Sequence, residues 1–224
     1  MVILAAISVV FKAAVRKATR SASVVDLGDI ALVLIMVRAT GGSVSTAGPP
    51  FLAMPDAASW IAVSASFLFL YLSGRLIVSS LGIDRMDKEG ISAGGAAHSL
   101  RKLGRPAAMA AAFPYCLAGA LLEELLFRHM LYSEIAETMG PGAASILQAV
   151  AFSAVHGIPA LLLRHGRRIA AYAISFPFIS GLMLQSLYSC TGSVASPTIV
   201  HWALNVSAVW RASLKTRQVY DDAR

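Results

Sequence analysis

Two adjacent glutamates, Glu123 and Glu124, lie with Arg128 inside one of the most apolar stretches of this 224-residue chain. A charged side chain near the centre of a bilayer costs roughly 2.5–3.5 kcal/mol on insertion scales, so these groups need partners within the protein. On a helix, Glu124 and Arg128 share a face and can neutralise each other. Glu123 projects about 100° away. It can therefore address a different neighbour.

Two other apolar segments carry polar groups at helical spacing. His156 follows Phe152 by four residues, and Asn205 follows His201 by four. His201 and Asn205 therefore share a helix face and can donate hydrogen bonds to a common point. Each pattern alone fits ordinary hydrogen bonding between membrane helices. Together with the glutamates they place polar groups deep in three apolar segments, which favours one shared site.

The composition indicates that membrane helices position these groups. The chain is 57% hydrophobic and 14% charged, with a mean hydropathy of +0.67, whereas about a quarter of the residues in a soluble domain are charged. Six apolar segments have lengths close to that needed to cross a bilayer. We expect an all-α fold, a polytopic transmembrane bundle of about six spanning helices at 25–41, 59–81, 106–133, 142–163, 169–190 and 194–211.

The N-terminal segment is too short in its apolar part to span a bilayer, and its basic residues follow the apolar run. An interfacial amphipathic helix is therefore expected there. The predicted organisation has four parts. They are an N-terminal interfacial segment (1–24), two spanning helices with a basic loop (25–105), a helix core that holds the polar groups (106–211) and a cytoplasmic tail (212–224).

The net charge of +7 is explained by topology. Sixteen of the nineteen Lys and Arg residues lie in tails and loops that fall on one side if six helices cross in alternation. By the positive-inside rule, both termini should be cytoplasmic. We expect a multi-pass protein of the cell membrane whose partners are the lipid bilayer and a membrane-associated peptide or protein, without nucleic acid. No sequence feature specifies an oligomeric state.

Three motifs in order give a specific resemblance. Glu-Glu-x-x-x-Arg (123–128), Phe-x-x-x-His (152–156) and His-x-x-x-Asn (201–205) resemble the signature motifs of the CAAX protease and bacteriocin-processing family. These intramembrane proteases are also called the Abi family. The resemblance covers about residues 106–211 and includes every motif position.

The resemblance implies a glutamate-type endopeptidase that requires no metal or cofactor. By motif, Glu123 would be the general base that activates water, and His156 would help to hold that water. His201 and Asn205 would stabilise the tetrahedral oxyanion. The supporting residues would be Glu124, Arg128 and Phe152. Family members cleave prenylated tails, leader peptides or other membrane-associated chains, and no motif here selects among them.

Other readings of the same residues remain open. One glutamate and two histidines could form a catalytic zinc site, although their spacing differs from that of the His-Glu-x-x-His helix. Cys116, two helical turns before Glu123, could be a nucleophile. A non-catalytic bacteriocin-immunity or scaffold protein, or a small transporter, could also retain buried carboxylates.

Overall fold

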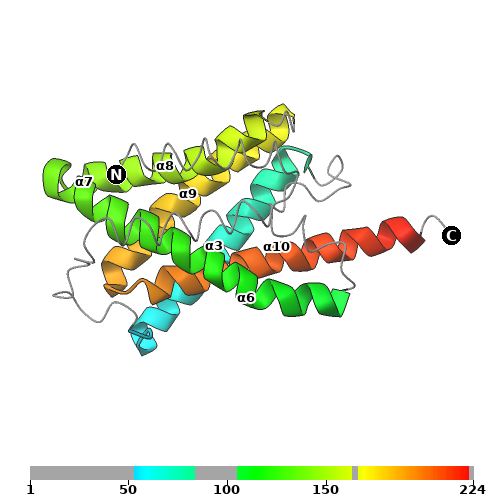
Figure 1. Ribbon diagram of the computed structural model, residues 1–224, viewed down its shortest axis with the longest axis horizontal. Coiled ribbons are helices and arrows are strands. Elements are labelled where there is room, and N and C mark those ends of the chain that lie inside the picture. The colour runs from blue at the N-terminus through cyan, green and yellow to red at the C-terminus, as the bar shows by residue number, and fades with distance from the viewer. Residues whose placement is uncertain (1–52, 84–104, 163–165, 222–224) are drawn as a thin grey trace.

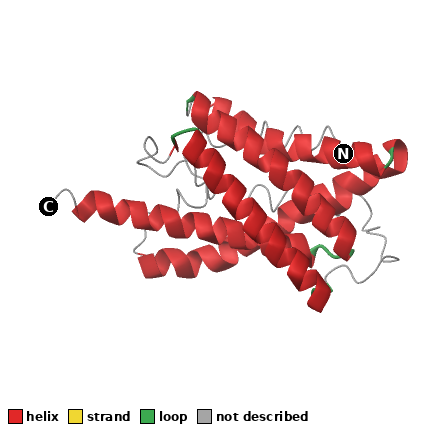
Figure 2. Ribbon diagram, turned by 180° about the vertical axis from the view of Figure 1, so that it is seen from behind, coloured by secondary structure: helices red, strands yellow, loops and turns green. Residues whose placement is uncertain are grey.

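A computed structural model describes residues 53–83, 105–162 and 166–221, and within these ranges it is entirely helical apart from turns (Figure 2). The elements in chain order are α3 (Ala57–Ser80), α6 (Arg105–Glu124), the π-helix η2 (Leu125–Leu131), α7 (Tyr132–Met139), α8 (Pro141–Leu162), α9 (Arg167–Thr191) and α10 (Ala195–Asp221). The all-α prediction is therefore confirmed for the described part of the chain.

Four helical runs of the described chain are long and apolar enough to cross a membrane. They are α3, the continuous run Pro106–Met139, α8 and α9. They coincide with four of the six predicted spans, so the number six is not confirmed. The predicted span at 25–41 and the interfacial segment at 1–24 lie outside the described residues.

The last predicted span, 194–211, forms part of helix α10 but is not among those four runs. Its hydropathy is lower because His201, Asn205 and a polar first turn interrupt the apolar residues. The helix that supplies two of the candidate site residues is thus the least typical membrane segment among the long helices.

The helices α6, η2 and α7 form one long run, after which α8 returns along the bundle (Figure 1). The turn between α9 and α10 contains Gly192, whose φ of 66° is in the left-handed region that glycine adopts without steric cost. Helix α8 packs along α9, α10 packs along α6, and α3 contacts both α9 and α10. Helix α10 therefore lies against three helices, α6, α3 and α9.

Apolar clusters hold these helix pairs together. Between α6 and α10 the buried residues are mostly small, which lets the two backbones approach closely. This cluster consists of Ala112, Cys116, Val209 and Ala212. A second cluster joins α3, α9 and α10 and consists of Val63, Leu70, Leu184, Leu187 and Val200. A third joins the η2 region to α8 and consists of Phe127, Leu131, Phe152 and Val155.

Three prolines lie inside the predicted helices, as the sequence indicates. Pro114, Pro159 and Pro177 are internal to α6, α8 and α9. Each lacks an N–H, so one carbonyl of the preceding turn needs another donor.

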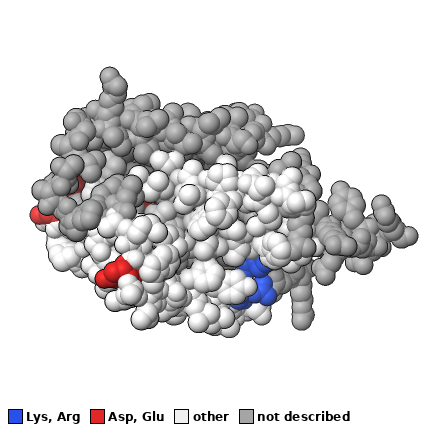
Figure 3. Space-filling view, turned by 90° about the horizontal axis from the view of Figure 1, so that it is seen from below, with Lys and Arg blue, Asp and Glu red and all other residues white. Residues whose placement is uncertain are grey.

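Seen from below, the described surface carries few charged side chains (Figure 3). Exposed apolar residues such as Leu68, Ile146 and Leu161 fit a surface that faces lipid.

Candidate active site

A change of helix type follows directly after the two glutamates. Glu123 and Glu124 end helix α6, and the next seven residues form the π-helix η2, in which the Tyr132 N–H bonds to the Phe127 carbonyl five residues earlier. His129 of η2 contacts α9, with its Nδ1 3.2 Å from the Tyr188 hydroxyl. Nothing in the sequence pattern predicts this π-helix. Such segments often occur at functional sites because they alter the direction in which side chains point.

Glu124 and Arg128 form the predicted ion pair. Arg128 Nε lies 3.1 Å from Glu124 Oε2, and both side chains are 0% exposed. The guanidinium also covers the ring of Phe152, with Cζ 4.2 Å from the ring centroid. Since a cation over an aromatic face is attracted to the ring, Phe152 adds a second partner for the buried charge.

His201 contacts both glutamates at once. Its Nδ1 lies 2.8 Å from Glu124 Oε1, and its Nε2 lies 3.8 Å from Glu123 Oε2. Sequence reasoning assigned Glu124 to Arg128 alone and missed this second contact. The sequence pattern carries no sign of this contact, because Glu124 and His201 are 77 positions apart and meet only through the packing of α10 against α6.

His156 approaches Glu123 from helix α8. Its Nε2 lies 3.7 Å from Glu123 Oε2, and its Nδ1 lies 2.8 Å from the backbone carbonyl of Phe152. The Phe152 ring also packs beside the His156 ring, with 4.6 Å between centroids, and edge-on to the His201 ring at 5.9 Å. Phe152 therefore orients both imidazoles as well as the guanidinium.

These contacts assign the hydrogen on each ring. A carbonyl oxygen only accepts, so His156 carries a hydrogen on Nδ1. The Nδ1 of His201 likewise donates to the carboxylate of Glu124. Both rings consequently turn Nε2 towards the same atom, Oε2 of Glu123. The centre of the site therefore contains one carboxylate and two imidazole nitrogens.

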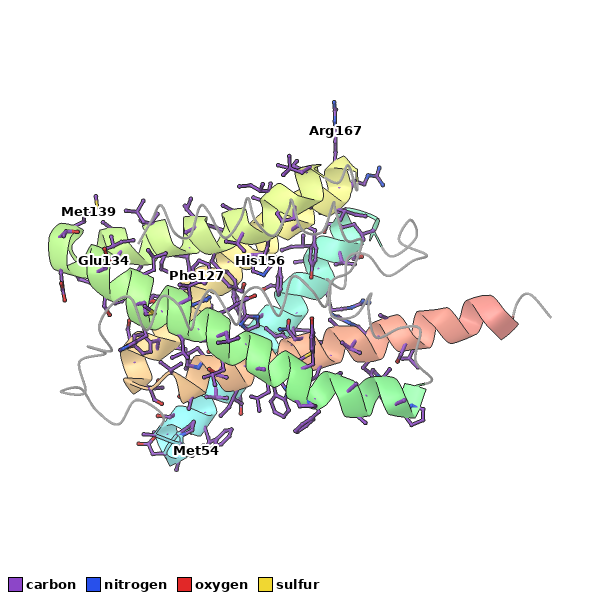
Figure 4. All side chains as sticks on the ribbon, viewed as in Figure 1. Met54, Phe127, Glu134, Met139, His156 and Arg167 are labelled. Atoms are coloured by element: carbon purple, nitrogen blue, oxygen red, sulfur yellow. The ribbon has the colours of Figure 1, made fainter. Side chains whose placement is uncertain are left out.

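The site has a buried part and a partly exposed part. The side chains of Glu124 and Arg128 are fully buried, whereas those of Glu123 and His156 are 27% and 33% exposed. The side chains of Glu123 and His156 are thus partly accessible, although the Glu123 Oε2 atom that both rings face is itself buried. Figure 4 shows Phe127 and His156 midway along the bundle, with Glu134 and Arg167 towards its ends.

Asn205 is the candidate residue that the geometry connects least. It is half-buried one turn beyond His201 on α10. Within the described part of the chain, no hydrogen bond joins its side chain to the glutamates or histidines of the site.

Cys116, the alternative nucleophile, lies away from these residues. It is buried in the apolar cluster beside Val209 and Ala212, so its surroundings are those of a small buried hydrophobe.

No set of three or more His, Cys, Asp or Glu residues in the described ranges has an arrangement that could hold a metal ion. The three groups at the centre of the site approach one another at 3.7 and 3.8 Å. The described geometry therefore adds no support to the zinc reading of these residues.

Comparison with known proteins matches residues 105–207 to the family model described as type II CAAX prenyl endopeptidase Rce1-like. The matched segment runs from the start of α6 into α10 and contains all three sequence motifs. No curated protein and no solved structure matches the chain. Residues 105–207, which hold every candidate site residue, therefore match the Rce1-like family model, in agreement with the resemblance to the CAAX protease and bacteriocin-processing family.

Proposed function

We propose that this protein is an intramembrane endopeptidase in which Glu123 activates a water molecule. The observation that carries the proposal is the convergence of two histidine Nε2 atoms on Glu123 Oε2, at 3.7 and 3.8 Å. Each ring is held by a hydrogen bond at its other nitrogen. A base positioned in this way, with part of its side chain open to water, is what general-base hydrolysis requires.

The first chemical step forms the tetrahedral intermediate. Glu123 accepts a proton from water while the water oxygen bonds to the carbonyl carbon of the peptide. His156, which is as exposed as Glu123, orients that water through Nε2. The electron pair of the carbonyl bond moves to oxygen and produces an oxyanion, which needs hydrogen-bond donors fixed in advance.

His201 and Asn205 are the proposed donors to this oxyanion. When the His201 ring also carries a proton on Nε2, the bond from Nδ1 to Glu124 stabilises the resulting imidazolium. The Asn205 amide lies one turn away on the same helix face. Once Glu123 has accepted the proton from water, the Glu124 carboxylate and the oxyanion are balanced by one guanidinium and one imidazolium, so the site is neutral overall.

Collapse of the intermediate completes the cleavage. Glu123 returns its proton to the amide nitrogen, the C–N bond breaks, and the products are a new carboxyl terminus and a free amine. The proton acquired in the first step is the one released in the second, so Glu123 is regenerated. No cofactor enters this sequence of steps.

The proposed substrate is a membrane-associated peptide or protein, and the first class to test is a prenylated C-terminal tail, following the description of the matching family. The apolar surface around the bundle fits a substrate that approaches through lipid. The basic loops support a location in the cell membrane with both termini in the cytoplasm.

The test uses the purified protein in liposomes with a fluorogenic farnesylated peptide and the same peptide without the lipid. Wild type should cleave, and Glu123→Gln should lose roughly 10²–10⁴-fold in kcat, as expected when a general base is removed. Glu134→Gln, which removes an exposed carboxylate on α7, is the matched control and should retain activity. Cleavage by Glu123→Gln at the wild-type rate would exclude the proposed mechanism. If only the farnesylated peptide is cleaved, the prenyl group is part of recognition.

A further inference from the structure

The position of His201 depends on how α10 is rotated and shifted along α6. His201 must place one nitrogen 2.8 Å from Glu124 and the other 3.8 Å from Glu123. A small rotation of α10 would break both approaches, because the two acids project in directions about 100° apart. Beside the small apolar residues that pack α10 on α6, a polar contact between these helices would oppose such rotation.

Trp202, the next residue along α10, makes such a contact. Its indole N–H donates to the Phe113 carbonyl of α6 at 3.0 Å. Its ring also meets the Phe113 ring edge-on, with 4.4 Å between centroids and 90° between planes. An indole N–H at a lipid-facing surface has few alternative acceptors, which makes this bond hard to replace.

The contacts of His201 and Trp202 meet α6 at well-separated points. Phe113 precedes Glu123 by ten residues, or about 15 Å along a helix, whereas His201 and Trp202 are adjacent. Contacts this far apart on α6, from neighbouring side chains of α10, fix both the rotation and the axial position of α10. The Phe113 carbonyl lies next to Pro114, so Trp202 binds α6 beside its internal proline.

We propose that Trp202 is a positioning residue that sets the orientation of His201 through its bond to the Phe113 carbonyl. This inference deepens the proposed function and rests on it for its catalytic consequence. Trp202 need not touch the substrate. Its effect passes through the backbone of α10 to the adjacent imidazole.

The main variant is Trp202→Phe, which keeps an aromatic ring and removes the N–H. With the farnesylated peptide, kcat should fall about 10-fold, within the loss expected from a misplacement of under 1 Å, while KM stays within about twofold. Trp60→Phe, on the exposed side of α3, is the matched control and should match wild type. Phe113→Leu retains the carbonyl and should retain most of kcat.

A second readout does not depend on proteolysis. The ¹⁵N NMR spectrum of histidine-labelled protein, with His201 identified by its loss in His201→Gln, should show His201 Nδ1 protonated in a single environment in wild type and in a mixture of environments in Trp202→Phe. Melting temperatures of the two Trp→Phe variants are measured in parallel, which separates a general loss of stability from a change at His201. If wild type cleaves no peptide, the proposed function fails, yet the His201 signal still tests Trp202.

An unchanged kcat and an unchanged His201 signal in Trp202→Phe would overturn the inference. So would a loss of kcat that only follows a lower melting temperature with the His201 signal intact, because that pattern indicates a purely structural role. An equal loss in Phe113→Leu would overturn the assignment to the indole N–H.

Discussion

Glu124 holds His201 through a 2.8 Å contact between Oε1 and Nδ1, while its other oxygen pairs with Arg128 at 3.1 Å. One buried carboxylate thus fixes the orientation of an imidazole and neutralises a guanidinium. The arrangement turns Nε2 of His201 towards Glu123. The pair of adjacent glutamates therefore divides into a fully buried residue that orients His201 and a partly exposed residue, Glu123.

The buried ion pair predicts strong coupling between Glu124 and Arg128. Either single variant, Glu124→Gln or Arg128→Met, leaves an unpaired buried charge and should lower the free energy of unfolding by about 3–5 kcal/mol. The double variant removes both charges and should recover most of that loss. Reversible unfolding in mixed micelles measures the cycle. Additive losses in the double variant would show that the two residues do not stabilise each other.

The close approach of α8 and α9 predicts that Gly157 cannot be enlarged. A Cβ at Gly157 would clash with Ile174 Cγ1, whereas a Cβ at Gly142 of the same helix meets nothing within 4 Å. Gly157→Ala should therefore lower the melting temperature, and Gly142→Ala should not. Adding Ile174→Ala to Gly157→Ala removes the clashing atom and should restore part of the stability. Equal melting temperatures for the two single variants would contradict this contact.

The start of α3 predicts a pH-dependent contribution to stability. Asp56 accepts a hydrogen bond from the Ser59 N–H at 2.7 Å, and hydrogen bonding from the Ser59 side chain and backbone lowers the pKa of the Asp56 carboxyl. Because this pKa is lower in the folded protein, the stabilisation is present above the unfolded pKa of about 3.9 and is lost as pH falls through the folded value.

Thermal unfolding of wild type and Asp56→Asn between pH 3 and 7 measures this contribution. Asn can still cap the helix, so the two proteins should differ little in melting temperature at low pH and most near neutrality. A difference that grows on acidification would have the wrong sign for a carboxylate with a lowered pKa.

The proposed chemistry predicts that peptide cleavage survives metal removal. Dialysis against a strong chelator should leave kcat within about twofold, because the steps assigned to Glu123 and His201 require only proton transfer and hydrogen bonding. Elemental analysis of the purified protein is measured in parallel. Loss of activity that added zinc restores would instead assign Glu123, His156 and His201 as ligands of a catalytic zinc ion.

The sequence by itself determined the helical segments and the residues that could react. Continuous apolar stretches of about 20 residues have few folds available in lipid, because every backbone polar group must be bonded internally. The spacing of Glu124 and Arg128 likewise determined their ion pair, since residues four apart on a helix are neighbours.

Only the tertiary structure decided how those residues meet. The double contact of His201, the approach of His156 to Glu123 and the Trp202 bond to Phe113 all depend on how α6, α8 and α10 pack. Local sequence periodicity reports which face of a helix is apolar, and it carries no information about the rotation of one helix against another. The groups of the proposed active site must align to a fraction of an ångström. The rotation of α10 and α8 against α6 therefore decides whether Glu123 can act as a base.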